Sequence, residues 1–580
     1  MKAVASIMNT SSEGPDARRR LVVCSLLLVG FVVILLRLFF LQVIQGPELA
    51  NKARRQHLKV ITLNSSRGAI YDRQGRALAL NLDVPSVYAT PASIEDPAET
   101  ARQLATVLGL SPWEVEERLR MKRDFVWVKR KVTHPQAQVI RSLSLKGIEL
   151  LLEEKRFYPK GTLLSHVLGF AGIDSQGLEG LERGYEPYLR GKDRKVVLQR
   201  DGLGRTIIPR GRGEDSVLSG HTIRLTIDEV IQYIAERALD AAVAKTGARG
   251  GTIIALDPQT GGVLGWALRP TFDPNRFRAA TPDLWRNRAV TDPYEPGSTL
   301  KIILAAAALE EGIVEPGTLI YAGDGQMPVS GTIIHDHEKS GWLTFAQAME
   351  RSSNVAAVKT SLALGKEQLY WYLRAFGFGE RTEIDLPGES KGILKPPENW
   401  DERTLASIAI GQEIGVTPLQ LVTAAAAIAN QGWLMKPYVV QEIRDGQGEL
   451  DWVRKPQVHR RPISQKTAAI LTELLVNAVR EGTGKRARIP GYRVAGKTGT
   501  AQKVDPMTGG YSSTRLIGSF VGFVPAENPR LVLLVMIDEP QGPAWGSLVA
   551  APVFREVAEQ VLRYLQVPPD GAEKMTVAAA

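Results

Sequence analysis

The feature that most constrains this chain is an apolar run near its start, residues 21–44, with the sequence LVVCSLLLVGFVVILLRLFFLQVI. Only Ser25, Arg37 and Gln42 interrupt it. As an α-helix with a rise of about 1.5 Å per residue, the run would cross the ~30 Å hydrocarbon layer of a bilayer. The sequence therefore predicts one membrane-spanning anchor at residues 21–44.

The residues before this run predict its orientation. Arg18, Arg19 and Arg20 directly precede the run, so the positive-inside rule makes residues 1–20 a cytoplasmic tail and places the rest of the chain outside. A cleavable signal peptide is the alternative, but the run is too long and QGPELANKARR offers no A-x-A cleavage site. Arg37 is predicted to extend toward the outer face, although an intramembrane charge can also mark a contact with a partner. We therefore predict a single-pass protein of the cell (inner) membrane with an extracytoplasmic catalytic region.

Composition excludes several other classes of protein. The chain has 580 residues, of which 44% are hydrophobic and 23% charged, as in globular proteins of several domains. Its one cysteine, Cys24, lies in the anchor, so no intrachain disulfide can form. The net charge of +10 raises the question of nucleic acid, but the basic residues are scattered and no nucleic-acid-binding motif accompanies them. The charge predicts a surface that faces anionic lipids or cell-wall polymer.

Two regions follow the anchor. Residues 45–215 mix short alternating runs, such as HLKVITL and FVWVKRKV, with helical patterns and contain no catalytic cluster. Residues 216–568 begin with a strand, a helix and a hairpin, continue with helices, and end with the strands LIGSFVGFV and RLVLLVMID and a last helix. Strands at both ends with helices between them predict a sheet covered by helices on each face. Residues 569–580 are predicted to be a tail.

The segment GYRVAGKT, residues 491–498, matches the phosphate-binding pattern G-x-x-x-x-G-K-[ST]. A phosphate loop needs a buried strand before the first glycine and a helix after the lysine. The preceding segment is charged and breaks at Pro490, and the following one has more glycines, a proline and no helical period. We therefore predict that YRVAGKTGTAQ is a strand and that the chain has no ATP site.

A serine and a lysine lie three residues apart in YEPGSTLKIILAAAALEEG. Pro296 and Gly297 break the chain and Ser298 begins a run of strong helix formers, so Lys301 lies one turn on and its amine can reach the Ser298 hydroxyl. A nucleophilic serine needs a base, and a lysine can serve when desolvation or another cation lowers its pKa. Taken alone, the pattern is more typical of an N-capping serine and a surface lysine.

Two further clusters carry suitable chemistry. Ser352 and Asn354 begin another helical pattern, and their hydroxyl and amide suit proton relay and the binding of a peptide amide; taken alone, they also fit a helix cap. Lys497, Thr498 and Gly499 lie on the predicted strand and offer a cation and a hydroxyl for a carboxylate, with a residue lacking a side chain where a substrate passes closely.

The segment IIHDHEKSG contains residue types that could ligate a metal. It places His335, Asp336, His337 and Glu338 together, but the context is strand-like and supplies no distant third ligand. We interpret it as a solvated hairpin and predict neither a metal nor a cofactor.

The order of the three clusters, S-x-x-K, then S-x-N, then K-T-G on a late strand, resembles that of penicillin-recognising serine enzymes. The segments RNRAVTDPYEPGSTLK, SSNVAAVK, IGQEIGVTPLQLVTAAAAIANQG and GYRVAGKTGTAQK resemble the transpeptidase domain of class B penicillin-binding proteins, and SSRGAIYDRQGRALA resembles their non-catalytic pedestal. DSQGLEG, together with GYRVAGKTGTAQK, is most similar to the division-specific, septal branch. The resemblance implies an α/β penicillin-binding transpeptidase fold, with an antiparallel sheet covered by helices, after an α+β pedestal of dimerisation type.

The resemblance also implies a peptidoglycan D,D-transpeptidase. By analogy, Ser298 attacks the D-Ala-D-Ala carbonyl, Lys301 accepts its proton, Ser352 passes a proton to the departing D-alanine and Asn354 positions the acyl chain. Lys497 and Thr498 hold the terminal carboxylate, Gly499 leaves room for substrate, and the backbone N–H groups of Ser298 and Thr500 form the oxyanion hole. The residue acting as general base stays open at this point.

The implied partners are peptidoglycan stem peptides, β-lactams that acylate the same serine, the membrane, a polytopic glycosyltransferase and other division proteins. The alternatives are an elongation-type transpeptidase, a D,D-carboxypeptidase or β-lactamase that transfers the acyl group to water, and a non-catalytic scaffold that binds β-lactam or peptidoglycan. A free hydrolase has no use for an anchor and a pedestal, and a cytoplasmic tail of some twenty residues has no room for a signalling domain.

Overall fold

A computed structural model of the chain describes residues 15–63, 65–191, 194–200, 206–207, 219–505 and 508–570. By its internal contacts the chain divides into two compact units, one of residues 1–65 and 192–218 and one of residues 66–191 and 219–580. Most of the predicted cytoplasmic tail and the last ten residues of the predicted C-terminal tail lie outside the described residues. The domain boundaries proposed from the sequence stay predictions.

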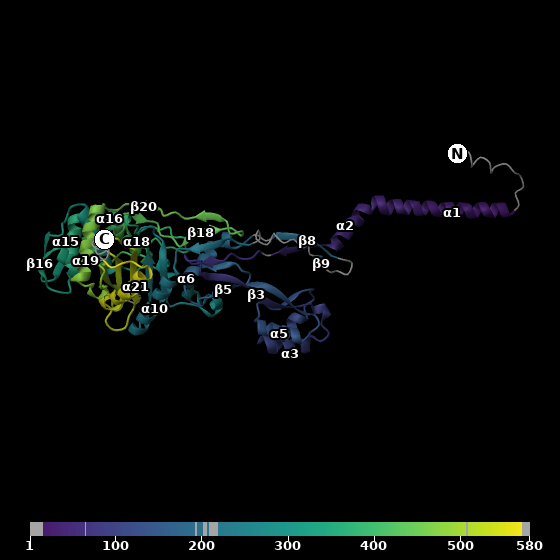
Figure 1. Cartoon of the computed structure of the whole chain (residues 1–580), viewed down its shortest axis with the longest axis horizontal. Coiled ribbons are helices and arrows are strands. Elements are labelled where there is room, and N and C mark those ends of the chain that lie inside the picture. The colour runs from purple at the N-terminus through teal and green to yellow at the C-terminus, as the bar shows by residue number, and fades with distance from the viewer. Residues whose placement is uncertain are drawn as a thin grey trace, which may run out of the picture. The chain divides into compact units, whose positions relative to one another are not determined.

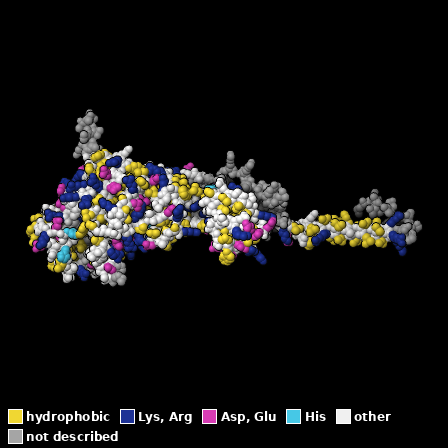
Figure 2. All heavy atoms as spheres, turned by 90° about the horizontal axis from the view of Figure 1, so that it is seen from below, with side chains coloured by type: hydrophobic (Ala, Val, Ile, Leu, Met, Phe, Trp, Pro, Cys, Tyr) yellow, Lys and Arg dark blue, Asp and Glu magenta, His cyan; other side chains and the backbone are white. Residues whose placement is uncertain are grey.

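The small unit carries the apolar run. Helix α1 (Pro15–Phe39) continues through one π-helical turn, η1 (Phe40–Ile44), and is followed by α2 (Gly46–His57). The stretch Arg18–Ile44 is long and apolar enough to cross a membrane, with a mean hydropathy of 2.9, and none of it is buried against the rest of the chain. Figure 2 shows hydrophobic side chains along this helix and basic ones at its N-terminal end. Strands β1 (Leu58–Leu63), β8 (Arg194–Arg200) and β9 (Thr206–Ile207) form a three-stranded sheet.

The large unit begins with a sheet whose strands come from distant parts of the chain. Its order is β19-β18-β10-β2-β3-β4, and β5 also pairs with β3. The bounds are β2 (Ile70–Tyr71), β3 (Ala77–Ala89), β4 (Val126–Lys129), β5 (Ile148–Phe157), β10 (Thr222–Leu225), β18 (Val440–Arg444) and β19 (Leu450–Val453). Helices α3 (Pro97–Leu108), α4 (Pro112–Leu119) and α5 (His134–Ser142) share a core with β3 and β4 that includes Val87, Leu104 and Val128. The sheet therefore joins the region before residue 215 to the region after it.

A second sheet has five antiparallel strands in the order β12-β11-β23-β22-β21. These are β11 (Gly250–Leu256), β12 (Val263–Arg269), β21 (Ala495–Val504), β22 (Tyr511–Val524) and β23 (Leu531–Asp538). Helices α10 (Glu229–Thr246) and α21 (Ala551–Tyr564) lie side by side over one face and share a core with its strands (Figure 1). The wholly buried helix α18 (Pro418–Ala429) packs on the same strands within a different core. The predicted sheet with helices on each face is confirmed.

The elements around the edge strand β21 hold the sequence motifs. A 3₁₀ turn, η4 (Gly297–Leu300), leads into α13 (Lys301–Glu310), and α14 (Phe345–Arg351) leads into α15 (Asn354–Leu364). The hairpin β14 (Gln326–Val329) and β15 (Thr332–His335) lies between the hairpin partners β13 (Leu319–Gly323) and β16 (Gly341–Thr344) in the chain. Residues 495–504 form the predicted strand, and no helix follows Lys497 within it, so the phosphate-loop geometry is absent from this described segment.

The other described helices and strands are shorter or connect these layers. They are η2 (Pro91–Ser93), α6 (Ser165–Leu168), β6 (Phe170–Ala171), β7 (Gly177–Glu179), α7 (Gly180–Gly184), α8 (Glu186–Leu189), η3 (Pro274–Ala279), α11 (Pro282–Trp285), α12 (Arg288–Thr291), α16 (Lys366–Ala375), η5 (Pro397–Asn399), α17 (Glu402–Ala409), β17 (Leu434–Met435), β20 (Val458–Arg460), α19 (Gln465–Arg480), η6 (Lys485–Ala487) and α20 (Gly546–Val549).

Candidate active site

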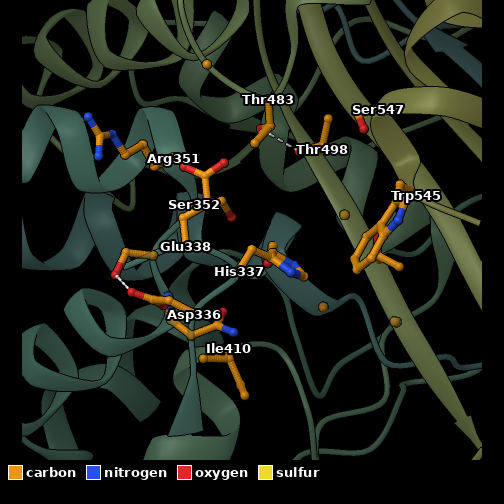
Figure 3. A pocket seen from close by; sticks show the side chains of 18 of the residues that line it. Asp336, His337, Glu338, Arg351, Ser352, Ile410, Thr483, Thr498, Trp545 and Ser547 are labelled. Atoms are coloured by element: carbon orange, nitrogen blue, oxygen red, sulfur yellow. Dashed lines mark hydrogen bonds between the residues drawn. The ribbon is translucent and has the colours of Figure 1, made fainter. Parts of the chain in front are cut away.

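A cavity of about 1040 Å³ brings the three motifs together. It lies between the η4 turn, the end of β15, the α14–α15 junction and the edge strand β21 (Figure 3). The predicted site residues that line it are Ser298, Ser352, Asn354, Thr498, Gly499 and Thr500. Lys301 and Lys497 are buried beside it, with 2% and 0% of their surface exposed. Positions about 200 residues apart in the chain thus form one site.

Ser298 lies in the η4 turn directly before α13, at the predicted helix start. Gly297 precedes it with a left-handed φ of +57°, and a Cβ at Gly297 would come 2.7 Å from the carbonyl oxygen of Thr500. Glycine therefore allows the turn to pack directly against β21. Ser298 is partly exposed and faces the cavity, as a nucleophile must.

Lys301 makes different contacts from those that its spacing predicts. Its Nζ donates to Asn354 Oδ1 at 2.6 Å and to the Ser352 carbonyl oxygen at 2.7 Å, and lies 3.4 Å from Ser352 Oγ. Within the described residues no hydrogen bond joins Lys301 to Ser298. The spacing fixed only the distance between the two backbone positions, whereas a buried amine must turn toward the oxygens that can bind it. Lys301 therefore links α13 to the α14–α15 junction.

Burial changes the charge of both lysines. It lowers the pKa of Lys301 well below its ordinary value; the nearby cation Lys497 lowers it further, and the carboxylate of Asp336 opposes both effects. Burial also lowers the pKa of Lys497 to about 7. Lys497 can therefore exist as a neutral amine near neutral pH, and Lys301 loses its proton more readily than an exposed lysine does. A neutral amine can accept a proton.

Ser352 occupies the centre of this arrangement. It ends α14 in the left-handed conformation, with φ of +60°. Its hydroxyl accepts a hydrogen bond from Lys497 Nζ at 2.7 Å and lies within 3.4 Å of Lys301 Nζ. One hydroxyl on the cavity wall is thus in contact with both buried lysines, an arrangement that suits proton relay.

Gly499 on strand β21 is packed tightly by its neighbours. A Cβ at Gly499 would come 2.5 Å from Ser519 Oγ and 2.8 Å from Thr299 Cγ2, both inside the protein. The missing side chain therefore makes room for the η4 turn and β22. Gly499 also lines the cavity, and its role beside a passing substrate stays a prediction. Thr498 Oγ1 contacts Thr483 Oγ1 at 2.7 Å (Figure 3). Thr500 Oγ1 accepts a hydrogen bond from the Gly546 N–H at 3.2 Å.

Sequence reasoning missed two contributors to the cavity. Thr483 follows α19, and nothing in its neighbourhood resembles a binding motif. Asp336 was assigned to a solvated hairpin, and His335, His337 and Glu338 are indeed exposed. The Asp336 carboxylate, however, accepts hydrogen bonds from Ser353 Oγ at 2.6 Å and from the Val355 N–H at 3.0 Å. No local sequence pattern predicts these contacts, because Asp336 lies far from Ser353 and Val355 in the chain.

One histidine of this hairpin contacts an aromatic ring at the cavity. The His337 ring meets the Trp545 ring edge-on, with centroids 4.6 Å apart, across the mouth of the cavity (Figure 3). In the part of the chain that the structure describes, no group of three or more His, Cys, Asp or Glu side chains is placed to hold a metal ion.

Comparisons with known proteins find relatives that match both regions of the chain. The family model of the Penicillin binding protein transpeptidase domain matches residues 251–559, and that of the Penicillin-binding Protein dimerisation domain matches residues 62–225. Stage V sporulation protein D of Bacillus subtilis is 38% identical over 94% of this chain and 85% of its own length. Peptidoglycan D,D-transpeptidase FtsI of Escherichia coli is 31% identical over 98% of this chain and 96% of its own.

Solved structures agree with these matches. The crystal structure of penicillin binding protein 3 from Mycobacterium tuberculosis in its apo form has a TM-score of 0.68 and 29% identity, and the match covers 88% of this chain and 98% of that one. The same protein complexed with aztreonam gives a TM-score of 0.69 at 28% identity, over the same shares of the two chains. Both domains and their order in the chain thus have counterparts in one family. The chain belongs to the class B penicillin-binding proteins, a family of serine-type peptidoglycan D,D-transpeptidases.

Proposed function

We propose that the cavity transfers the acyl group of a peptidoglycan stem peptide through an ester on Ser298. The observation that carries this proposal is the pair of buried lysines in contact with Ser352, beside a serine that faces the cavity. Burial makes the Lys301 amine easier to deprotonate, so it can act as a base, and the Ser352 hydroxyl can relay the proton.

In this reaction Ser298 Oγ attacks the carbonyl carbon between the two D-alanines and its proton moves to the Lys301 amine. The bond to the terminal D-alanine breaks, and Ser352 passes a proton to the departing amine. An amine of a neighbouring stem peptide then attacks the ester, releases Ser298 and forms the cross-link. The proton from Ser298 reaches Lys301 directly or through Ser352, which is already in contact with that lysine.

The remaining residues bind the substrate. Thr498 and Thr483, whose hydroxyls are in contact, and the cation formed by Lys497 would hold the terminal carboxylate. Asn354 would bind an amide of the acyl chain, and the N–H groups of Ser298 and Thr500 would bind the oxyanion, supported by the close approach of Gly297 to the Thr500 carbonyl.

The cellular role that we propose is septal cross-linking by an enzyme with a cytoplasmic N-terminus and an extracytoplasmic catalytic region. The sequence similarity to FtsI over almost the full length of both chains and the basic residues before the apolar helix support it. The partners would be a polytopic glycosyltransferase and other division proteins. The greater identity to Stage V sporulation protein D supports a sporulation role as a second candidate. Depletion in growing cells separates the two, because only a septal enzyme gives filaments without septa.

The test of the reaction is covalent labelling by fluorescent penicillin. Wild-type protein should keep the label through a chase, and Ser298→Ala should take up none while melting close to the wild-type temperature, since losing one hydroxyl at a helix start costs about 1 kcal/mol. Labelling of the variant would refute the assignment of Ser298. Rapid loss of the wild-type label would favour a hydrolase, and mass analysis of products from a stem-peptide donor with an added amine would show which acceptor is used.

A further inference from the structure

Asp336 follows directly after strand β15 and reaches the start of helix α15. Its carboxylate accepts hydrogen bonds from the Ser353 hydroxyl at 2.6 Å, from the Val355 N–H at 3.0 Å and from the Asn354 N–H. Its own N–H donates to the Gly325 carbonyl oxygen at 2.8 Å, which fixes it to the turn before β14. One carboxylate thus satisfies three donors at the α14–α15 junction.

This junction contains both predicted catalytic side chains of the second motif. The Asn354 amide is held from two sides, because its Nδ2 donates to the His335 carbonyl oxygen at 2.7 Å and its Oδ1 accepts from Lys301 Nζ at 2.6 Å. Ser352 directly precedes Ser353 and Asn354, which are bonded to Asp336, and its own backbone is left-handed. A shift of the junction would therefore move Ser352 and Asn354 away from Lys301 together.

We propose that Asp336 is a positioning residue, which holds Ser352 and Asn354 against Lys301 and keeps an anion beside that lysine. The proposal rests on the function proposed above, since it assigns Asp336 to the same acylation step. Asp336 does not touch the reacting atoms; it acts through the α14–α15 junction and through its charge.

The electrostatic part of the proposal has a definite sign. Two charged groups act on the Lys301 amine, the cation Lys497 from β21 and the anion Asp336 from the end of β15. The titratable neighbours of Asp336 on its own segment are His335, His337 and Glu338, all of them exposed. Removing the Asp336 charge destabilises the protonated form of Lys301, so the pKa of Lys301 falls further.

The experiment measures the rate constant of acylation by penicillin against pH for full-length protein in detergent. Asp336→Asn should lower this constant by about 10- to 100-fold, as small displacements of catalytic groups do. It should also move the acid limb of the profile to lower pH, because Lys301 then stays neutral in more acidic solution. Asp336→Glu keeps the charge but moves it by one methylene, so it should lose rate and keep the wild-type limb.

Asp324→Asn is the matched control, because this exposed aspartate lies in the turn between β13 and β14 and its side chain bonds to none of the described residues. It should acylate like wild type. The proposal would be overturned if Asp336→Asn acylates at the wild-type rate with the wild-type pH profile. It would also be overturned if the acylation rate falls only in proportion to the folded fraction and the acid limb of the profile does not move. If Asp336→Asn does not fold, a shifted limb in Asp336→Glu overturns it instead. If wild-type protein takes up no penicillin label, the proposed function is refuted; this outcome is distinct from failure of the proposal for Asp336, which compares variants with a wild type that does label.

Discussion

The buried lysines make the stability of this protein depend on pH in an unusual direction. The pKa of Lys497 is about 7 in the folded chain and near the ordinary ~10.4 when unfolded. At pH values between about 7 and ~10.4 the unfolded chain binds more protons than the folded chain, so the free energy of unfolding increases as the pH rises. Below about pH 7 Lys497 is protonated in both states, and the folded protein then bears the full cost of burying its charge. Lys497→Met removes this dependence. Melting temperatures at pH 7 and pH 9 should therefore show wild type gaining stability relative to the variant.

The difference in melting temperature between wild type and Lys497→Met isolates the effect of Lys497. The many groups that titrate in both proteins cancel in the difference, and Lys497 is completely buried, so solvent does not screen the effect. A constant difference between the two melting temperatures across this range would show that Lys497 stays charged in the folded chain. The same variant should acylate much more slowly with carboxylate-bearing β-lactams.

A buried carboxylate in the first half of the large unit offers a second prediction at this scale. Glu182 is fully buried and pairs with Arg67 and Arg156, each at 2.6 Å. Burial alone would raise the pKa of Glu182, but the two guanidinium groups outweigh it and hold this pKa below its usual value. Glu182→Gln leaves two buried cations undercompensated and should cost about 3–5 kcal/mol of unfolding free energy.

The matched change for Glu182 is Glu99→Gln. Glu99 pairs with Arg102 at 2.8 Å, but 47% and 67% of the two side chains are exposed, so the loss should stay within about 1 kcal/mol. Chemical denaturation of both variants measures the comparison. Equal losses would mean that Glu182 is neutral in the folded protein.

The packing of the η4 turn against strand β21 is tight enough to test with one methyl group. Gly499→Ala would place a Cβ 2.5 Å from Ser519 Oγ and 2.8 Å from Thr299 Cγ2. Either the strand or the turn must move, at a cost of about 1–3 kcal/mol, and the turn carries Ser298. We expect slower penicillin acylation together with a lower melting temperature. Gly510→Ala adds the same methyl in the β21–β22 connection, where the nearest atom is 3.8 Å away, and should change neither.

At the scale of elements, the sequence predicts what depends on neighbours in the chain. The strand, helix and hairpin from β10 to β12 follow from local periodicity and turn residues, and the strand around Lys497 follows from its flanks. Contacts across the chain are different. The partners of Lys301 lie about fifty residues away at the α14–α15 junction, and the atoms that exclude a side chain at Gly499 come from η4 and β22. Periodicity carries no signal for either, so Asp336 and Thr483 were missed as well.

At the scale of the whole molecule, the anchor and the soluble region can be separated experimentally. Arg37 within the apolar helix costs at least ~2.5 kcal/mol in a bilayer unless it reaches the surface or binds a partner. Removing residues 1–44 should therefore leave a soluble protein that still binds penicillin but does not support septation in a depletion strain. Replacing the helix with an unrelated spanning helix should restore attachment without restoring division.

Two outcomes would change this interpretation of the anchor. Full complementation by the helix swap would reduce the anchor to a tether. Loss of penicillin binding after removal of residues 1–44 would show that the small unit supports the fold of the catalytic region.

The order of strands in the five-stranded sheet also determines how late in synthesis the sheet can be completed. Strand β11 lies between β12 and β23, but β23 begins only at Leu531. A ribosome adds about 5–20 residues per second, so the β11–β12 hairpin waits tens of seconds with one edge unpaired. That edge presents Ile253, Ile254 and Leu256, residues that promote strand association. We therefore expect newly made chains to need shielding during this interval, and a chain truncated before β23 to aggregate and to show no activity.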